Sequence, residues 1–290
     1  MLKVAKFGGS SLADAAQFQK VRNIVLSDDA RRLIVVSASG KRNKNDNKIT
    51  DLLYLCHAHL QYSVSCEQVF SMIESRYLDI KRELGLAVDI ESDFARLRQK
   101  LDKSLSVDEL VSRGEFLTAR MMAEFLGYDF VDAAQLVCFD FDGKLNLDKT
   151  YEAMRQALSE HERIVMPGFY GSLPSGRIKV LSRGGSDISG ALLAAATGAD
   201  VYENWTDVSG ILMADPRIIE NPRRIDIVTY PELRELAYMG ANVLHEGAIY
   251  PVKDAGIPIN IRNTNQPDDP GTIICDEQSA PPAPEDPLIT

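Results

Sequence analysis

The chain has 290 residues, with 32 lysines and arginines against 42 aspartates and glutamates, so its formal net charge at pH 7 is −10. This acidic balance argues against generic binding to nucleic acids or anionic membranes, but not against anionic metabolites, which need only local positive charge. No apolar run approaches the length of a membrane span, and the N-terminus lacks a secretory signal pattern. Four scattered cysteines without a CxxC pair favour neither a disulfide framework nor a zinc site, so we expect the cytosol as the compartment.

The first part of the chain starts as an alternation of strand and helix. We expect a strand at residues 4–7, a helix at 12–26 and a buried strand at 32–38. A polar stretch rich in lysine and asparagine, residues 39–50, indicates a loop. Residues 51–105 have a helical pattern without a strong strand signal, and we interpret them as a helical insertion over the sheet edge.

The remainder continues the alternation. Helices are predicted at residues 113–127, 151–161, 187–197, 231–239 and 248–255, and strands at 130–132, 136–139, 163–170, 178–181, 200–203, 258–263 and 272–275. Repeated β–α alternation predicts a largely parallel sheet with helices on both faces. The Pro-rich, acidic residues 276–290 are expected to be a linker, with a following domain absent from this chain.

One device occurs twice: an apolar strand, a basic residue, two adjacent glycines, hydroxyl groups and then a helix. The first copy places Lys6 before Gly8 and Gly9, and the second places Arg183 before a Gly-Gly-Ser-Asp run. Adjacent glycines let the backbone approach a ligand closely, and a helix N-terminus behind them supplies free N–H groups. Two such loops predict two anionic ligands held face to face, as phosphoryl transfer requires.

Lys6 lies at the carboxyl end of the first strand, where open α/β sheets bind ligands. It is interpreted as a phosphate clamp, and the alternative is a solvated surface lysine beside a turn. Ser186 and Asp187 are good helix N-caps, but Asp187 at an anion site needs another reason, since it would repel phosphate. It could orient Lys6 or bind the magnesium that accompanies ATP.

Two further charged residues are candidates for substrate contacts. The planar guanidinium of Arg183 suits a carboxylate or a phosphate, and its alternative is an ordinary salt bridge. Glu115 follows Arg113 and Gly114 at the start of a helix. The helix dipole alone explains an acidic residue there, and the functional alternative is recognition of a substrate ammonium group.

A third loop, after the strand at residues 200–203, contains Trp205, Thr206 and Asp207, followed downstream by Arg217. This loop could hold a nucleotide, although an Asp-Pro-Arg turn is also a common structural element. Trp205 suits core packing or adenine stacking equally. The GxxxxGK[ST] pattern of P-loop proteins is absent, so ATP would be handled on another fold.

Taken together, these segments resemble the aspartate kinases, within the amino acid kinase family. The resemblance rests on motifs that occur in the family's order, namely KFGGSS at 6–11, SRGE at 112–115, SRGGSD at 182–187, WTDVSGI at 205–211, DPR at 215–217 and GANVLH at 240–245. It extends from Leu2 to about Cys275.

The resemblance implies phosphorylation of the β-carboxylate of L-aspartate by ATP with Mg²⁺, the first step of the lysine, threonine and methionine branch of amino-acid biosynthesis. It implies a three-layer αβα sandwich. The catalytic domain would span residues 1–275, with an amino-acid-binding lobe at about 1–165 and a nucleotide-binding lobe at about 166–275. The final stretch resembles the family's linker to regulatory domains, and the family suggests a homodimer.

Roles are carried over by position. Lys6 would neutralise the transferring phosphoryl group, Asp187 would organise the site, Arg183 would hold the α-carboxylate and Glu115 the ammonium group of aspartate. The other substrate positions are Ser37, Thr50 and Ser186, and the nucleotide positions are Lys6, Gly8, Gly9, Ser10, Thr206, Asp207 and Arg217. No set of protein ligands for a metal is expected.

Two departures from the family pattern concern the nucleotide. Asn242 stands where many members carry lysine, and Leu212 where they often carry tyrosine. Either another cation, such as Arg217 or Lys253, compensates for the lost lysine, or ATP binds more weakly.

Two other functions stay open at this point. One is a different amino acid kinase, acting on glutamate, N-acetylglutamate or carbamate. The other is a catalytically silent binding or assembly module.

Overall fold

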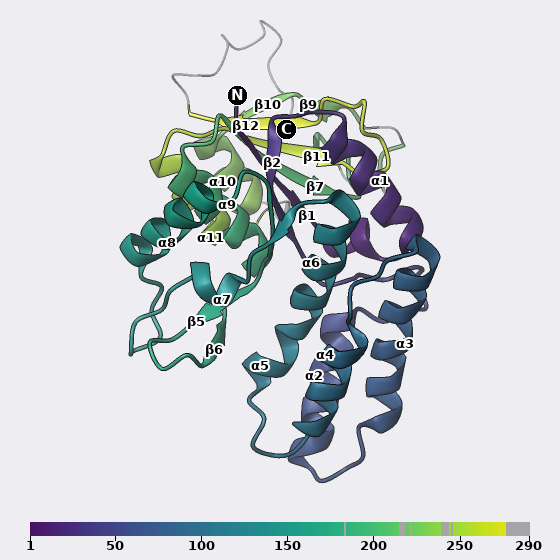
Figure 1. The fold of residues 1–290 in the computed structure, drawn as a ribbon. Coiled ribbons are helices and arrows are strands. Elements are labelled where there is room, and N and C mark those ends of the chain that lie inside the picture. Colours follow the sequence, from purple (N-terminus) through teal and green to yellow (C-terminus); the bar gives the residue numbers. More distant parts are fainter. Residues whose placement is uncertain (183, 215–217, 221, 239–243, 245, 277–290) are drawn as a thin grey trace, which may run out of the picture.

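The computed structural model describes residues 1–276 apart from 183, 215–217, 221, 239–243 and 245. Its centre is an eight-stranded sheet with helices on both faces (Figure 1). In order across the sheet the strands are β10 (Ile227–Thr229), β12 (Thr272–Cys275), β11 (Ile259–Asn263), β7 (Val201–Thr206), β1 (Lys3–Phe7), β2 (Arg31–Val36), β4 (Ile164–Pro167) and β3 (Asp129–Phe130). Every neighbouring pair is parallel except β11 and β12, which confirms the predicted, mainly parallel sheet.

A hydrophobic core lies on each face of this sheet. Successive residues of a strand point to opposite faces, so Val4 of β1 joins one core while Ala5 and Phe7 join the other. The core with Phe7 includes helices α1 (Ala15–Leu26), α2 (Ile49–Gln61), α3 (Glu67–Leu84), α4 (Glu91–Gln99), α5 (Val107–Val111) and α6 (Arg113–Leu126). The core with Val4 includes α7 (Ala133–Leu136), α8 (Leu147–Glu160), α9 (Gly185–Thr197), α10 (Tyr230–Tyr238) and α11 (Glu246–Asp254).

The predicted helical insertion is present as α2, α3 and α4. Figure 1 shows these helices extending away from the central sheet. A short 3-10 turn, η1 (Gly9–Leu12), separates β1 from α1, which begins after Asp14 because the Asp14 carboxylate accepts a hydrogen bond of 2.9 Å from Gln17 N.

One predicted strand is wrong, and another is present but lies outside the central sheet. Residues 136–139 begin as the end of helix α7, whose N-cap Asp132 accepts from Ala134 N at 2.9 Å. Residues 178–181 contain β6 (Ile178–Val180), but it pairs antiparallel with β5 (Tyr170–Ser172) in a separate two-stranded sheet. A strand as short as β6, buried only in part, lacks the two apolar faces that a central strand needs. A second small pair joins β8 (Ile211–Leu212) to β9 (Arg224–Ile225).

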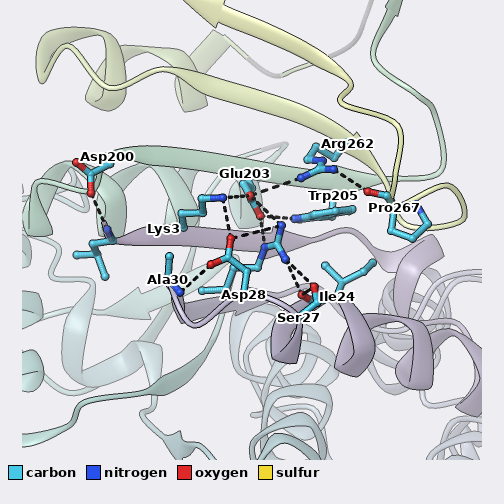
Figure 2. Close-up of polar contacts among 12 residues, drawn as sticks. Lys3, Ile24, Ser27, Asp28, Ala30, Asp200, Glu203, Trp205, Arg262 and Pro267 are labelled. Atoms are coloured by element: carbon cyan, nitrogen blue, oxygen red, sulfur yellow. Dashed lines mark hydrogen bonds and ion pairs between the residues drawn. The ribbon is translucent and has the colours of Figure 1, made fainter.

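A buried ionic network crosses the middle of the sheet (Figure 2). The carboxylate of Glu203 on β7, only 1% exposed, accepts from Arg31 Nε at 2.7 Å and from Trp205 Nε1 at 2.9 Å. Lys3 Nζ lies 3.3 Å from the same carboxylate, and Arg262 lies at 3.9 Å. Burial by itself raises the pKa of Glu203, but the bonds from Arg31 hold it below its ordinary value. The network therefore links β1, β2, β7 and β11 to one another.

Candidate active site

A cavity of about 840 Å³ opens where β1, β2 and β7 reach their carboxyl ends. This is where open α/β sheets bind ligands. Its lining includes every described residue of the predicted site, namely Lys6, Gly8, Gly9, Ser10, Ser37, Thr50, Glu115, Ser186, Asp187, Thr206 and Asp207. The other two predicted site residues, Arg183 and Arg217, lie outside the described residues.

Lys6 and Asp187 form the central ion pair of the cavity. Lys6 Nζ lies 2.5 Å from Asp187 Oδ1, and Asn204 Nδ2 of β7 donates to the same oxygen at 2.9 Å. Lys6 is 7% exposed, so the interpretation as a solvated surface lysine is wrong. Of the two roles considered for Asp187, the geometry supports orientation of Lys6, because its carboxylate holds the ammonium group against the cavity wall.

Glycines bring two backbone segments into contact at the floor of the cavity. A Cβ on Gly9 would lie 2.9 Å from Ala38 O, and one on Gly40 would lie 2.5 Å from the carbonyl carbon of Gly9. The second glycine pair has a different use, since Gly184 adopts φ +74° as the N-cap of α9. That left-handed conformation carries a steric cost for every residue with a Cβ.

Glu115 lies in the first turn of α6, where Gly114 packs so closely on Ala38 that an added Cβ would meet its Cβ at 2.7 Å. The Glu115 side chain is 4% exposed, and its Oε2 has no hydrogen-bond partner among the described residues. Burial raises the pKa of Glu115 to about 8, although the backbone N–H groups of Ala38 and Glu115 and the charge of Arg113 act in the opposite direction. A buried carboxylate without a counter-ion in the described structure is suited to a cationic ligand group.

The three hydroxyl residues predicted near the substrate come from three different elements. Ser37 follows β2, with its N–H donating to Phe7 O at 3.1 Å, and Thr50 lies in the first turn of α2. Ser186 lies in the first turn of α9 and packs on Gly168, where an added Cβ would be 2.7 Å from Ser186 Cβ. The fold therefore brings all three to the same cavity.

The end of β7 supplies Thr206 and Asp207 to the cavity, while Trp205 points the other way. Trp205 is 1% exposed and stacks on Phe7 with ring centroids 5.9 Å apart, and the guanidinium of Arg262 lies 4.6 Å from its ring. Trp205 is thus a core residue, and adenine stacking on it is excluded by its burial.

The lining also contains residues that the sequence analysis did not single out, namely Ala38, Ser39, Gly40, Lys41, Lys48, Asp51 and Phe169, together with Gly184 and Gly185 of the second predicted glycine loop. Phe169 adopts φ +80°, a conformation that non-glycine residues rarely hold without a structural constraint. Here Phe169 N donates to Ser189 Oγ at 3.0 Å and Phe169 O accepts from Leu181 N at 2.7 Å. The signal that could have found it is the Gly-Phe pair directly after a buried strand.

The described residues contain no cluster of three or more His, Cys, Asp or Glu side chains placed to hold a metal ion. None of the described helices combines the length and the apolar character needed to cross a membrane.

Known proteins with similar sequences are aspartokinases. Aspartokinase 3 of Bacillus subtilis is 38% identical over 290 residues, which cover 94% of this chain and 63% of that protein. The lysine-sensitive aspartokinase 3 of Escherichia coli is 32% identical over 299 residues and is covered to 65%. The chain thus spans somewhat less than two thirds of these relatives.

Solved structures agree with this. The aspartate kinase of Clostridium acetobutylicum superposes with a TM-score of 0.91 at 48% identity, covering 97% of this chain and 64% of that one. Escherichia coli aspartokinase III, solved in complex with aspartate and ADP, has a TM-score of 0.84 at 30% identity, with 97% and 66% covered. The sequence pattern of the amino acid kinase family matches residues 1–263, and with the sheet and cavity found here the chain belongs to that family.

Proposed function

We propose that this chain is the catalytic region of an aspartate kinase, which transfers the γ-phosphoryl group of ATP to the β-carboxylate of L-aspartate and forms 4-phospho-L-aspartate. The observation that carries the proposal is the pairing of two features in one cavity. Glu115 offers an ammonium group a buried carboxylate whose Oε2 has no hydrogen-bond partner among the described residues, and the Lys6–Asp187 pair with the glycine loop offers a place to a phosphoryl group. The aspartokinase relatives support this choice of substrate.

In the reaction, an oxygen of the substrate β-carboxylate attacks the γ-phosphorus and forms the new P–O bond. The bond from that phosphorus to the bridging oxygen breaks, and ADP leaves with the electron pair. An aspartate carboxylate has an ordinary pKa of about 3.9 and is already ionised at neutral pH, so no general base is required. The difficulty is to bring two anions together, and Lys6 and the backbone N–H groups at the glycine loop lower that cost.

Mg²⁺ fits the cavity only as an ion bound mainly by the phosphates of ATP. Magnesium at nucleotide sites commonly takes one or two carboxylates together with phosphate oxygens and water. Asp207 lines the cavity and would serve, while Asp187 keeps its role of holding Lys6. When bound, the ion would neutralise phosphate charge.

The same proposal assigns the two ligands to different parts of the chain. Residues 1–165 would bind the amino acid and residues 166–275 the nucleotide, because Glu115 and Thr50 come from the first part and Thr206 and Asp207 from the second. A homodimer and a cytoplasmic location stay predictions.

Two alternatives compete. An acylated acceptor such as N-acetylglutamate has no ammonium group for Glu115, so the buried Oε2 without a partner in the described structure favours a free amino acid. A silent binding module would have no need for the Lys6–Asp187 pair in the cavity, and its presence favours catalysis.

The test is ATP-dependent formation of a hydroxamate from L-aspartate in the presence of Mg²⁺ and hydroxylamine, which traps an acyl phosphate. We expect product from the wild type and a loss of about 100-fold or more in Lys6→Ala, because an electrostatic contact made to the transferring group is removed. Lys149→Ala, an exposed lysine on α8, is the control and should retain wild-type activity. Product from glutamate but not aspartate, or none from a folded wild type that binds ATP, would reject the proposal.

A further inference from the structure

Within the segment that joins β2 to α2, residues 40–48 form a closed loop beside the glycine floor of the cavity, and we name it the lysine loop. At its start, Gly40 N donates to Gly9 O at 2.8 Å. At its end, Ile49 N donates to Ser39 O at 3.2 Å, so the two ends of the loop meet. The loop therefore leaves the scaffold and returns to it within hydrogen-bonding distance of the glycines that form the floor.

Lys41 and Lys48, near the two ends of the loop, both line the cavity. Both side chains are exposed, and within the described part of the chain neither forms an ion pair. The described lining contains four carboxylates and three lysines, and the third lysine, Lys6, is already paired with Asp187. Within the described lining, Lys41 and Lys48 thus add two cations without an ion pair to the charge that Lys6 presents to a bound anion.

Arg76 of α3 fastens the loop from behind. Its guanidinium is buried, with 5% of the residue exposed, and Nη1 donates to Gly40 O at 3.0 Å and to Asn47 O at 2.9 Å. Nη2 donates to Asp46 Oδ1 at 2.5 Å. One side chain thus holds both ends of the lysine loop, next to Lys41 and Lys48.

Asp46 connects Arg76, which clamps the lysine loop from behind, to Arg42 within the same loop. Its Oδ2 accepts from the backbone N–H of Arg42 at 3.0 Å and from Arg42 Nε at 2.9 Å. Burial raises the pKa of Asp46, but the bonds from Arg42 and the charge of Arg76 together hold it well below its ordinary value. The Asp46 carboxylate is therefore favoured in its charged form beside Arg76.

We propose that the lysine loop is a phosphate-binding arm: Lys41 and Lys48 contact the terminal phosphate of ATP, and Arg76 is the positioning residue that sets their place. Gly40 touches Gly9, so Lys41 lies one residue from the point where a phosphate against the glycine floor would sit. The inference rests on the proposed kinase function and adds the groups that balance the charge of the transferring phosphate.

The first test compares the binding of MgATP and MgADP by calorimetry. Lys41→Ala and Lys48→Ala should each weaken MgATP by about tenfold or more, the order expected for a lost charge-assisted contact, and MgADP by less than about twofold. Lys44→Ala is the matched control, because it removes the same charge from the same loop at an exposed position that does not line the cavity. MgATP affinities of the two variants within twofold of Lys44→Ala, or an equal loss for MgADP, would overturn the assignment.

The second test separates positioning from mere folding. Arg76→Gln should weaken MgATP by about tenfold while its far-UV spectrum stays that of the wild type, and Arg76→Lys should restore part of the loss. Adding Lys41→Ala and Lys48→Ala to Arg76→Gln should weaken MgATP binding little further, because lysines that Arg76 no longer positions contribute little to the affinity. Full additivity of the losses would show that Arg76 does not act through these lysines.

A third readout is physical and needs no catalysis. The lysine loop contains four trypsin sites, at Lys41, Arg42, Lys44 and Lys48. Trypsin should cut the loop faster in Arg76→Gln than in the wild type, and MgATP should protect the wild type more than MgADP does. Equal cutting rates in both proteins would contradict the clamp.

The proposal and the proposed function fail in different ways. If the wild type makes hydroxamate but the lysine variants bind and turn over MgATP normally, the arm is wrong and the kinase function stands. If the wild type makes no acyl phosphate but the two lysines still discriminate MgATP from MgADP, the arm stands and the acceptor is wrong.

Discussion

A single buried carboxylate determines how this site should respond to pH. Glu115 is almost without solvent contact, and burial raises its pKa to about 8, against an ordinary value near 4.5. The folded protein therefore binds this proton more strongly than the unfolded chain does. The stability linked to Glu115 is fully present below about pH 4.5 and is lost as the pH rises through about 8.

We expect Glu115→Gln to raise the melting temperature of the ligand-free protein at pH 8.5, and to change it little at pH 4.5, where the wild-type carboxyl is also neutral. Thermal unfolding followed at these two pH values measures the difference. Asp51→Asn, next to Thr50 in α2 and exposed in the cavity lining, is the control and should show no such dependence. An equal effect of Glu115→Gln at both pH values would contradict the raised pKa.

The same carboxyl should govern aspartate binding. An ammonium group pairs with the ionised form of Glu115, so below about pH 8 the KM for aspartate should rise by up to about tenfold per pH unit. In Glu115→Gln the KM should be high at every pH and lose this slope. Initial rates measured from pH 6 to 9 decide the point, and a flat wild-type profile would show that Glu115 is not the ammonium partner.

At the scale of elements, the Glu203 network joins four central strands in addition to their apolar packing. The buried carboxylate of Glu203 accepts hydrogen bonds from Arg31 and Trp205. Removing one member of such a buried pair costs free energy of unfolding, because its partner is left buried without a counter-charge. The apolar pattern of β7 identifies it as a strand. The pattern does not reveal which charged residues of the neighbouring strands pair with its buried carboxylate.

Removing one member of this network should therefore be severe. Glu203→Gln is expected to lower the free energy of unfolding by about 3–5 kcal/mol, because the Arg31 guanidinium stays buried without its counter-ion. Asp79→Asn, which breaks an exposed pair with Arg82 on α3, should cost less than about 1 kcal/mol. Urea unfolding of both variants measures the two losses of free energy. Similar values would mean that the buried network contributes no more to stability than an exposed ion pair does.

At the scale of the molecule, the cavity lies where elements of both hydrophobic cores meet. Asp187 and Ser186 come from α9 on one face, while Thr50 and Glu115 come from α2 and α6 on the other. A ligand that fills the cavity therefore contacts elements from both faces of the sheet and should stabilise the whole fold.

We expect L-aspartate together with MgADP, each at about a hundred times its dissociation constant, to raise the melting temperature by at least about 5 °C, since one ligand alone at that excess contributes about 2.7 kcal/mol. Succinate has the two carboxylates of aspartate but no ammonium group for Glu115, so replacing aspartate by it should leave only the MgADP shift. A thermal-shift series measures these. Stabilisation by succinate equal to that by aspartate would reject ammonium recognition.

The sequence by itself determined the features that depend on near neighbours. Strand and helix patterns follow from local periodicity, and they predicted the mainly parallel sheet and the helical insertion. The glycine pairs, Lys6, Glu115 and Asp187 stood out because their residue types suit anion and ammonium binding, and all of the described ones line one cavity.

Only the tertiary structure decided what depends on residues far apart in the chain. It placed Trp205 in the core, took β6 out of the central sheet, and paired Lys6 with Asp187. It also brought the lysine loop to the glycine floor through Arg76, although the loop has no local pattern beyond its polarity. The physical reason is that burial and charge pairing are set by which surfaces meet, and that is a property of the packed chain rather than of any segment in it.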